Sequence, residues 1–327
     1  MLTRFLLTAC LALGLIAPAA AQNYPDRTIT LIVPFAAGGA SDVSSRIMAE
    51  AMGKILGQSI VVENVAGAGG ATGSLRARNA APDGYTIGFA HMGTHAASVA
   101  TNPKLPYDPR KDFDYLGVHL ITPSMVIVRK DFPATDLPAF IAYAKEKKKG
   151  LKMGHNGVGS LSHLSCLLFF QLIEVEPTYV VYRGFGQTIN DILSGAIDGT
   201  CDLTASTTAH VTGGSVRGFA VASDTRFPTM PDVPTAAEGG LPAYKVEAWL
   251  GLFAPKNLPP AILAKLRDAA VKALDDSMVK EKIEGIGGIL PKPEDRGGAR
   301  MQAMVERDTA RILEAVRKAG PLEDKPN

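Results

Sequence analysis

A glycine-rich turn between an apolar run and a helical pattern constrains this chain more than any other segment. The apolar run covers residues 29–33, and Pro34 ends it because proline lacks the backbone N–H that a sheet requires. Gly38 and Gly39 let the backbone turn, and apolar residues then recur at helical spacing over residues 43–56. A helix that begins here directs its free N–H groups and the positive end of its dipole into the turn. The segment therefore predicts a site that holds a small anion without Lys or Arg.

The same arrangement recurs in the second half of the chain. A short strand over residues 152–155 precedes a turn with Gly157 and Gly159, and Ser160 stands where a hydroxyl N-cap is favoured. Leucines then recur at helical spacing over residues 164–172. In all, four strand-to-helix turns are expected to expose free N–H groups, at residues 35–42, 66–73, 156–163 and 183–188.

The first 21 residues have the features of a cleaved secretory signal. Arg4 supplies a positive charge, residues 5–17 are nearly all apolar, and a run of small residues ends at Ala21. The apolar stretch is too short for a comfortable membrane span. The alternative, a lipoprotein signal at Cys10, would place that cysteine inside the apolar stretch. We therefore expect a soluble, periplasmic protein that starts near Gln22.

Composition narrows the possible partners and the redox chemistry. The net charge of +2 gives no electrostatic footprint for nucleic acid or for a membrane surface, so we expect neither as a partner. Beyond the signal the cysteines are Cys166 and Cys201, without zinc-type spacing. In an oxidising compartment they could form a disulfide, or both could be buried as small core side chains. The sequence leaves both alternatives open.

Strands and helices alternate along two stretches, which predicts an α/β fold with parallel-type sheets and flanking helices. About 306 residues beyond the signal exceed what one compact core usually holds, so two domains are expected. Two extended apolar segments, residues 115–129 and 246–254, are long enough to cross between them. The expected strands are residues 28–33, 59–63, 85–89, 152–155, 177–182, 196–203 and 217–222. Helices are expected near residues 43–56, 75–80, 136–149, 164–172, 187–193, 262–274 and 300–319.

No constellation of catalytic residues stands out in the sequence. The Gly-x-Ser-x-Gly turn of hydrolases and the Gly-Lys-Ser/Thr ending of a phosphate-binding loop are absent. Residues 67–73 resemble a dinucleotide fingerprint, but the third glycine falls one place late and no suitable acidic residue follows. His91 and His95 have the spacing of metal ligands on a helix, but residues 92–94 between them predict a turn. We therefore expect no cofactor and no bound metal.

The turns at the strand ends predict binding instead of catalysis. Ligands of parallel α/β domains lie at the carboxyl ends of the strands, which is where these turns stand. Two such domains joined by crossing strands leave a cleft, and helix N-termini that face each other across it would hold a carboxylate. Several charge-assisted hydrogen bonds of about 1.5–3 kcal/mol each supply micromolar affinity after ordering costs. A hinge motion would close the cleft around the ligand.

Short motifs spread over the mature chain resemble one family of transport receptors. They are Tyr24-Pro25, residues 34–39 with Asp42, Glu63-Asn64 with residues 67–70, residues 82–86, residues 107–109 with residues 111–113, and residues 231–235 with Glu238. Together they resemble the Bug-type extracytoplasmic solute receptors of tripartite tricarboxylate transporters. The resemblance implies a two-lobed periplasmic-binding-protein fold of type II with the ligand cleft between the lobes. It also implies a carboxylated small molecule as the ligand.

The resemblance further implies which residues contact the ligand, largely through backbone groups and bridging waters. In the first lobe these are Phe35, Ala37, Gly38, Gly39, Asp42 and Thr94. In the second lobe they are Asn156, Gly157, Ser160, Ser162, His163, Gly184 and Asp202. Asp42 would read a ligand amino group or cap its helix, and Arg183 would pair with a distal carboxylate or point outward. A diacid, aliphatic or aromatic, is expected ahead of a citrate-like triacid.

These inferences combine into one expected protein. Residues 1–21 form the signal peptide, residues 22–122 and 246–327 the first lobe, and residues 123–245 the second lobe. We expect a monomeric, non-enzymatic periplasmic receptor that captures a di- or tricarboxylate, or an aromatic acid, and delivers it to the membrane permease of a tripartite tricarboxylate transporter. Two alternatives stay open, namely an exported α/β enzyme acting on a carboxylated substrate and a ligand-sensing partner of a signalling protein.

Overall fold

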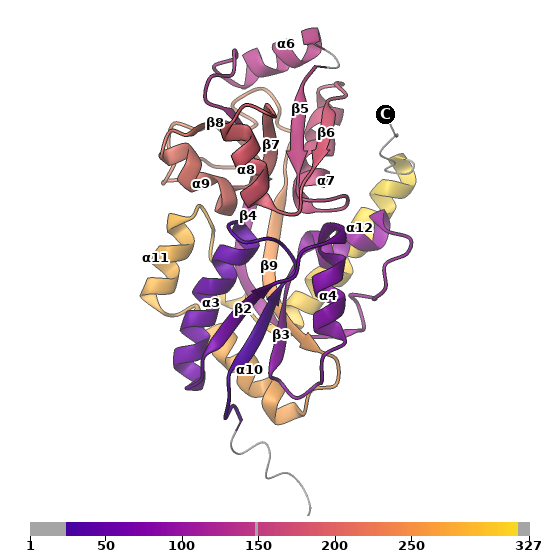
Figure 1. Cartoon of the computed structure of the whole chain (residues 1–327), viewed down its shortest axis with the longest axis vertical. Coiled ribbons are helices and arrows are strands. Elements are labelled where there is room, and N and C mark those ends of the chain that lie inside the picture. The colour runs from indigo at the N-terminus through magenta and orange to yellow at the C-terminus, as the bar shows by residue number, and fades with distance from the viewer. Residues whose placement is uncertain (1–23, 148–149, 320–327) are drawn as a thin grey trace, which may run out of the picture.

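The computed structural model describes residues 24–147 and 150–319, whose strands form one mixed sheet (Figure 1). From one edge to the other, the order is β2 (Ile60–Asn64), β1 (Ile29–Val33), β3 (Thr86–His91), β9 (Glu247–Pro255), β4 (Phe113–Arg129), β7 (Gly199–Leu203), β5 (Lys152–His155) and β6 (Thr178–Val181), while β8 (Val216–Val221) also pairs with β4. The expected signal peptide, residues 1–21, lies outside the described residues. The α/β class predicted from the alternating pattern is confirmed.

The long strand β4 connects the two halves of the sheet. Its residues 113–123 pair antiparallel with β9, and its residues 124–129 pair antiparallel with β7 and β8. Its 17 residues are buried almost throughout, as expected for a strand covered on both faces. At about 3.3 Å per residue they span roughly 56 Å. Both segments predicted to be extended and crossing are therefore strands, the first within β4 and the second as β9.

The first half of the sheet is parallel apart from the crossing strands. β1 pairs parallel with β2 and with β3, and a helix follows each of β1 and β2. The helices of this half are α3 (Ala40–Leu56), α4 (Ala71–Arg78), α5 (Ser98–Thr101), α10 (Pro260–Ala273), α11 (Ser277–Gly285) and α12 (Gly298–Ala319), with short 3-10 turns η1 (Ala68–Gly70) and η3 (Pro293–Asp295). α3 lies against α10 and α11, whereas α12 lies against β4, so the C-terminal helices return to this half.

The second half repeats the pattern with β5 parallel to β6 and β7. Its helices are α6 (Leu137–Lys147), α7 (Leu161–Leu172), α8 (Phe185–Leu193) and α9 (Thr204–Thr212). Alternate residues of β4 point to opposite faces, so Val126 and Val128 join the core under α6 and α7. Met125 and Ile127 join a separate core under α8. In the described ranges, neither half contains a helix with the length and apolar character needed to cross a membrane.

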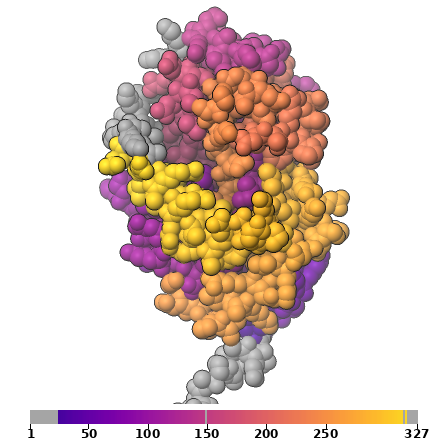
Figure 2. Space-filling view, turned by 180° about the vertical axis from the view of Figure 1, so that it is seen from behind, coloured from indigo at the N-terminus to yellow at the C-terminus, as the bar shows by residue number. Residues whose placement is uncertain are grey.

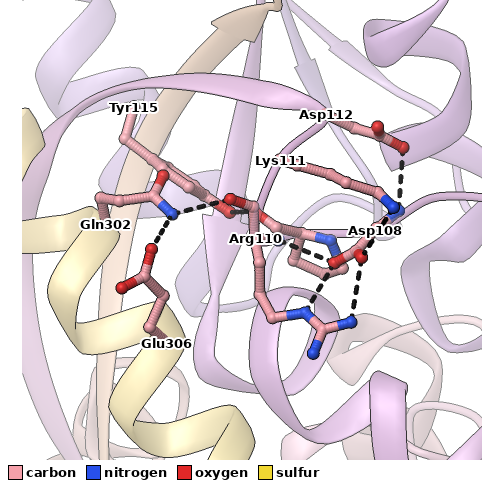
Figure 3. A network of polar contacts seen from close by, with 8 residues as sticks. Asp108, Arg110, Lys111, Asp112, Tyr115, Gln302 and Glu306 are labelled. Atoms are coloured by element: carbon pink, nitrogen blue, oxygen red, sulfur yellow. Dashed lines mark hydrogen bonds and ion pairs between the residues drawn. The ribbon is translucent and has the colours of Figure 1, made fainter.

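Polar contacts fix the segment between α5 and β4 against α12 (Figure 3). The Asp108 carboxylate accepts from Arg110 Nε at 2.8 Å and from Arg110 Nη2 at 2.9 Å, and Lys111 Nζ lies 3.4 Å away. The Arg110 carbonyl accepts from Gln302 Nε2 on α12 at 2.9 Å. The segment therefore forms a defined connection between α5 and β4.

Cys166 on α7 and Cys201 on β7 are buried neighbours with free thiols. The backbone N–H of Cys201 donates to Cys166 Sγ at 3.1 Å. Burial raises the pKa of the Cys201 thiol well above its ordinary value. The sequence left open a disulfide or two buried free thiols, and in the structure both cysteines are buried free thiols.

Several helical segments depart from the sequence predictions, and one of them is α11, which the sequence did not predict. Residues 92–94 were expected to form a turn, but they begin a π-helical turn, η2 (Gly93–Ala97), which continues into α5. The helix α9 was not predicted because its threonines have low helix propensity. There Thr208 Oγ1 donates to the Thr204 carbonyl at 2.8 Å, so the hydroxyl is satisfied within the helix. Contacts with β4 and β8 hold α9 where propensity alone would not.

Candidate functional site

The turn after β1 places the N-terminus of α3 at the carboxyl edge of the sheet. Gly39 is the N-cap residue, and it provides no side-chain hydrogen bond to the first N–H groups of α3. Gly38 adopts a φ of 92°, a conformation that favours glycine. The N–H of Ala40 donates to Ser206 Oγ on α9 at 2.8 Å. The start of α3 is thus completed by a residue from the other half of the molecule.

Asp42 supports this turn through its carboxylate, which is only 5% exposed. One oxygen accepts from the Gly38 N–H at 3.1 Å, and the other accepts from Asn64 Nδ2 at 3.1 Å and Arg46 Nε at 3.0 Å. Burial raises the pKa of Asp42, but hydrogen bonds from Arg46, Gly38 and Asn64 outweigh burial and leave that pKa below its ordinary value. Asp42 is the third residue of α3, and its oxygens bind the turn itself.

The turn after β5 is the counterpart in the second half. Gly157 and Gly159 have φ values of 106° and 79°, and Ser160 is the N-cap of α7. Ser160 Oγ accepts from the His163 N–H at 3.2 Å, which confirms the predicted hydroxyl cap. Ser162 Oγ accepts from the Asn156 N–H at 3.0 Å and so closes the turn. Hydroxyl groups therefore surround the start of α7.

Asp202 ends β7 beside this turn and is 3% exposed. Its oxygens accept from the Leu203 N–H and from Asn156 Nδ2, both at 2.7 Å. The neutral Ser206 side chain also favours the ionised form of this carboxylate. Burial raises the pKa of Asp202 to about 6, since these three groups are neutral and only partly offset the desolvation.

His91 ends β3 on the first half, with its ring stacked on Phe35 at 5.1 Å between centroids. Its Nδ1 accepts from the Thr94 N–H at 3.0 Å, which leaves the ring proton on Nε2. Burial lowers the pKa of His91 to about 4, so the ring is neutral at physiological pH. Thr94 Oγ1 lies 2.9 Å from His95 Nδ1 and thus bonds within the π-helical turn.

The turns of the two halves touch directly. The Ala36 N–H donates to the Arg183 carbonyl at 3.4 Å, while the Arg183 side chain is exposed. A Cβ on Gly184 would lie 2.9 Å from the Ala36 Cβ, and a Cβ on Gly157 would lie 3.1 Å from the backbone of Gly69. Glycines therefore permit an approach that larger residues would prevent. The structure is closed at this edge.

A cavity of about 30 Å³ remains between the turns, enough for about two water molecules. It is lined by Phe35, Ala36, Gly39, Ala40, Ser41, His91, Asn156, Ser160, Leu161, Ser162, Phe185, Asp202, Leu203 and Ser206. None of these described lining residues is Lys or Arg. The site thus offers an enclosed polar space in which helix N-termini and neutral donors supply the positive potential.

Comparison with known proteins identifies the family. The sequence matches the profile of the "Tripartite tricarboxylate transporter family receptor" (TctC) over residues 44–309. The chain belongs to this family. An Agrobacterium vitis protein of the UPF0065 group is 35% identical over 301 residues, which cover 92% of this chain and 87% of the relative. BugT of Bordetella pertussis is 30% identical over 288 residues, 87% of this chain and 88% of BugT.

Solved structures of similar proteins share the TctC receptor fold. MatC of Rhodopseudomonas palustris, solved with bound malate, is 40% identical with a TM-score of 0.86, covering 90% of this chain and 100% of that structure. The periplasmic binding protein BugD is 33% identical with a TM-score of 0.88, covering 91% and 99%. An R. palustris protein solved with adipate is 31% identical with a TM-score of 0.85, covering 91% and 100%. The periplasmic-binding-protein fold expected from the motifs is confirmed.

The structure of this TctC-family chain brings together some of the residues expected to bind ligand. Those that line the cavity are Phe35, Gly39, Asn156, Ser160, Ser162 and Asp202. Those that lie behind or beside its walls are Ala37, Gly38, Asp42, Thr94, Gly157, His163 and Gly184. Among the latter, His163 accepts from the Gly159 N–H at 3.1 Å through Nδ1, so that this nitrogen is used within the turn.

Sequence reasoning missed several lining residues, notably His91, Phe185 and Ser206. The spacing of His91 and His95 suggested only metal ligands. Among the described residues, no group of three or more His, Cys, Asp or Glu side chains could hold a metal ion. Its position at the end of β3 was the available signal, because ligands lie at the carboxyl ends of parallel strands. Ser206 had no such signal, since it belongs to the unpredicted helix α9 and reaches Ala40 across 166 residues of sequence.

A larger cavity of about 620 Å³ lies between α7, β9 and α12. Figure 2 shows the molecule from behind, where α12, in yellow, crosses the face beside a hollow. Leu164, Leu168 and Trp249 contribute to its largely apolar wall. Several of its ionic side chains are paired, among them Arg307 with Asp308 at 3.0 Å. The N-termini of α3 and α7, which suit an anion, line the smaller cavity. Leu161 lines both cavities.

Proposed function

We propose that this chain is a periplasmic receptor that holds the carboxylate of a small organic acid between the N-termini of α3 and α7. The observation that carries the proposal is the meeting of these two helix starts around an enclosed polar cavity whose described lining lacks Lys and Arg. The positive ends of helix dipoles and free N–H groups bind anions in such places. Ser160 and Ser162 add hydroxyl donors.

The ligands named for two similar structures support a carboxylate of modest size. Malate is bound in MatC and adipate in the second R. palustris protein, and both are dicarboxylates. The hydroxyl and amide groups around the cavity suit carboxylate oxygens in the same way. We therefore propose a dicarboxylate as the ligand class, ahead of tricarboxylates and aromatic acids.

Such an acid can enter only if the two halves separate, since the cavity holds about two water molecules. We propose two lobes, one of residues 22–122 and 246–327 and one of residues 123–245, that move about β4 and β9. The change of partner along β4, from β9 up to Pro123 to β7 from Ser124, supports this division. Hinges commonly lie at such crossing strands.

Family membership supports the remaining parts of the proposal. A TctC receptor delivers its ligand to a membrane transporter, so we propose the permease of a tripartite tricarboxylate transporter as partner. Export with cleavage of residues 1–21 would place the protein in the periplasm. We propose that it acts there as a monomer. The absence of a catalytic constellation in the sequence favours a receptor over an exported enzyme.

Ligand screening of the purified mature protein tests this function. Thermal shift against dicarboxylates, tricarboxylates, acidic amino acids and aromatic acids, followed by calorimetric titration of the hits, should identify a dicarboxylate with micromolar or tighter affinity. Ligand at 100 times the dissociation constant stabilises the folded state by about 2.7 kcal/mol. Protein freed of retained ligand that responds to no carboxylate would overturn the proposal. If NMR shows that the protein converts the bound acid into another compound, the protein is an enzyme instead.

A further inference from the structure

The cavity between the turns contains one carboxylate and no cation among its described lining residues. Asp202 faces the space that the proposed ligand enters, and it lies between Asn156 and Ser206, which also line that space. A site for an organic anion with its own buried carboxylate is unusual chemistry, because two like charges in an enclosed space repel. The presence of Asp202 therefore restricts which acids can fill the cavity.

Asp202 keeps spare capacity to accept a hydrogen bond. A carboxylate offers about four acceptor positions. Two are used, by the Leu203 N–H and by Asn156 Nδ2, each at 2.7 Å. A ligand group that donates a hydrogen to Asp202 would use a further position, whereas an ionised ligand carboxylate has no hydrogen to donate.

We propose that Asp202 is a specificity-determining residue, which selects organic acids that carry a hydroxyl or ammonium donor beside their carboxylates. This inference rests on the proposed function, since it names the ligand class of the same site. The ligand carboxylate occupies the start of α3 or α7, and the adjacent donor reaches Asp202. A site built to receive a donor discriminates strongly against the analogue that lacks it, because its buried polar group is then left unpaired.

Three of the titratable groups around Asp202, Cys201, Tyr244 and His91, are kept neutral by burial. On the elements packed around it the titratable or charged groups are Cys201 on β7, His155 on β5, Cys166 and His163 on α7, His210 on α9, Tyr244 and, across the cleft, His91 with the paired Asp42 and Arg46. Burial raises the pKa values of Cys201 and Tyr244 well above their ordinary values, so both stay neutral. Burial also keeps His91 neutral, since its pKa is lowered to about 4.

An acid without a donor has one other way to bind, which is to enter with Asp202 protonated. Burial raises the pKa of Asp202 to about 6, and a second anion nearby raises it further. Binding of a plain dicarboxylate then takes up one proton, and its affinity falls up to about tenfold per pH unit above 6. A hydroxy acid donates to the ionised carboxylate, so its affinity stays nearly constant over the same range.

Calorimetric titration of the mature protein with malate and with succinate, at pH 6.5, 7.5 and 8.5, tests the inference. The two acids share a four-carbon skeleton, and only malate carries the hydroxyl. We expect malate to bind at least about tenfold more tightly than succinate at pH 8.5, with the gap narrowing at pH 6.5. In the variant Asp202→Asn, which keeps the size of the side chain, the two acids should differ by less than about threefold at every pH. The exposed Asp232→Asn in the same lobe serves as the matched control and should behave like wild type.

The outcomes separate this inference from the proposed function. A wild-type protein that binds succinate and malate equally at pH 8.5, or an Asp202→Asn protein that keeps the wild-type preference, would overturn the role of Asp202 while leaving a carboxylate receptor in place. Absence of binding by every carboxylate in wild type and variant would overturn the receptor itself. If Asp202→Asn does not fold, titrating the wild type at pH 7.5 in two buffers of different ionisation enthalpy gives the answer. Succinate should take up about one proton and malate about none.

Discussion

Asp42 and Asp202 are both buried carboxylates beside helix starts, yet their pKa values move in opposite directions. Asp42 has the guanidinium of Arg46 within 3.0 Å, which keeps it charged despite burial. Asp202 has only neutral donors, so burial dominates and its pKa rises to about 6. The same residue type thus serves as a fixed structural anion in one turn and as a titratable group in the other. Environment, not residue type, assigns these roles.

Asp108 provides a prediction about acid stability. Hydrogen bonds from Arg110, and to a smaller extent the surrounding charges, lower its pKa in the folded protein to about 2. A lowered folded pKa contributes stability above the unfolded value near 3.9, and that contribution is lost as the pH falls toward 2. Asp108→Asn should therefore lower the free energy of unfolding by about 1–2 kcal/mol at pH 7 and by much less near pH 2.5. Urea unfolding at both pH values measures this, and an equal loss at both would contradict the assignment.

Sequence patterns predicted residues whose role is local and missed those whose role depends on distant partners. The N-cap Ser160 follows from its position before an apolar helix, since its hydrogen bond reaches only to residue 163. Ser206 Oγ accepts from the Ala40 N–H, and no local pattern encodes this contact. The same holds for the stacking of His91 on Phe35, which joins the ends of two strands.

The site is built on the N-terminal ends of α3 and α7, which differ in how their first N–H groups are capped. α7 has a side-chain cap at Ser160, whereas α3 begins at Gly39 without one and leaves its first N–H groups for partners. Helix boundaries near glycine and serine were predictable because those residues have positional preferences. The helix α9 was not, because its four threonines favour a strand and only its tertiary contacts hold it helical.

Two N-cap variants, one at the cavity and one away from it, distinguish an effect on ligand binding from an effect on stability. Ser160→Ala and Asp276→Ala each remove an N-cap hydrogen bond, in α7 and in α11 respectively. Both variants should lower the free energy of unfolding by about 1 kcal/mol. Only Ser160→Ala should also weaken ligand binding, by about 3- to 10-fold, since Ser160 lines the cavity. Urea unfolding and calorimetric titration make the comparison, and equal weakening by Asp276→Ala would indicate a general effect of stability.

At the scale of the whole molecule, β4 and β9 hold two α/β halves together so that their turns meet. The alternation of strands and helices predicted the α/β class, and the two long apolar segments predicted the crossing strands. The closed approach of the turns was not predictable, because it depends on contacts such as Gly184 against Ala36 between distant parts of the chain. The sequence showed glycines in turns without showing which of them face another backbone.

Gly184 tests whether closure is needed for binding. Its φ of 168° is extended, so a larger residue is accepted by the backbone, but a Cβ there would lie 2.9 Å from the Ala36 Cβ in the closed form. Gly184→Val should therefore hinder closure and weaken ligand binding at least about tenfold, with a nearly unchanged free energy of unfolding. Gly285→Ala, at a site with open space, is the control and should bind as wild type does. Undiminished affinity in Gly184→Val would show that the ligand does not need this contact.

A crystal structure of the mature protein with its tightest-binding dicarboxylate tests directly whether the ligand carboxylate lies between the starts of α3 and α7. We predict a ligand carboxylate within hydrogen-bond distance of the backbone at the start of α3 and of the hydroxyls at the start of α7, in an enlarged version of the cavity that Phe35 and Asp202 line. A ligand found instead in the large cavity beside Trp249 and α12, with the turns unoccupied, would contradict it.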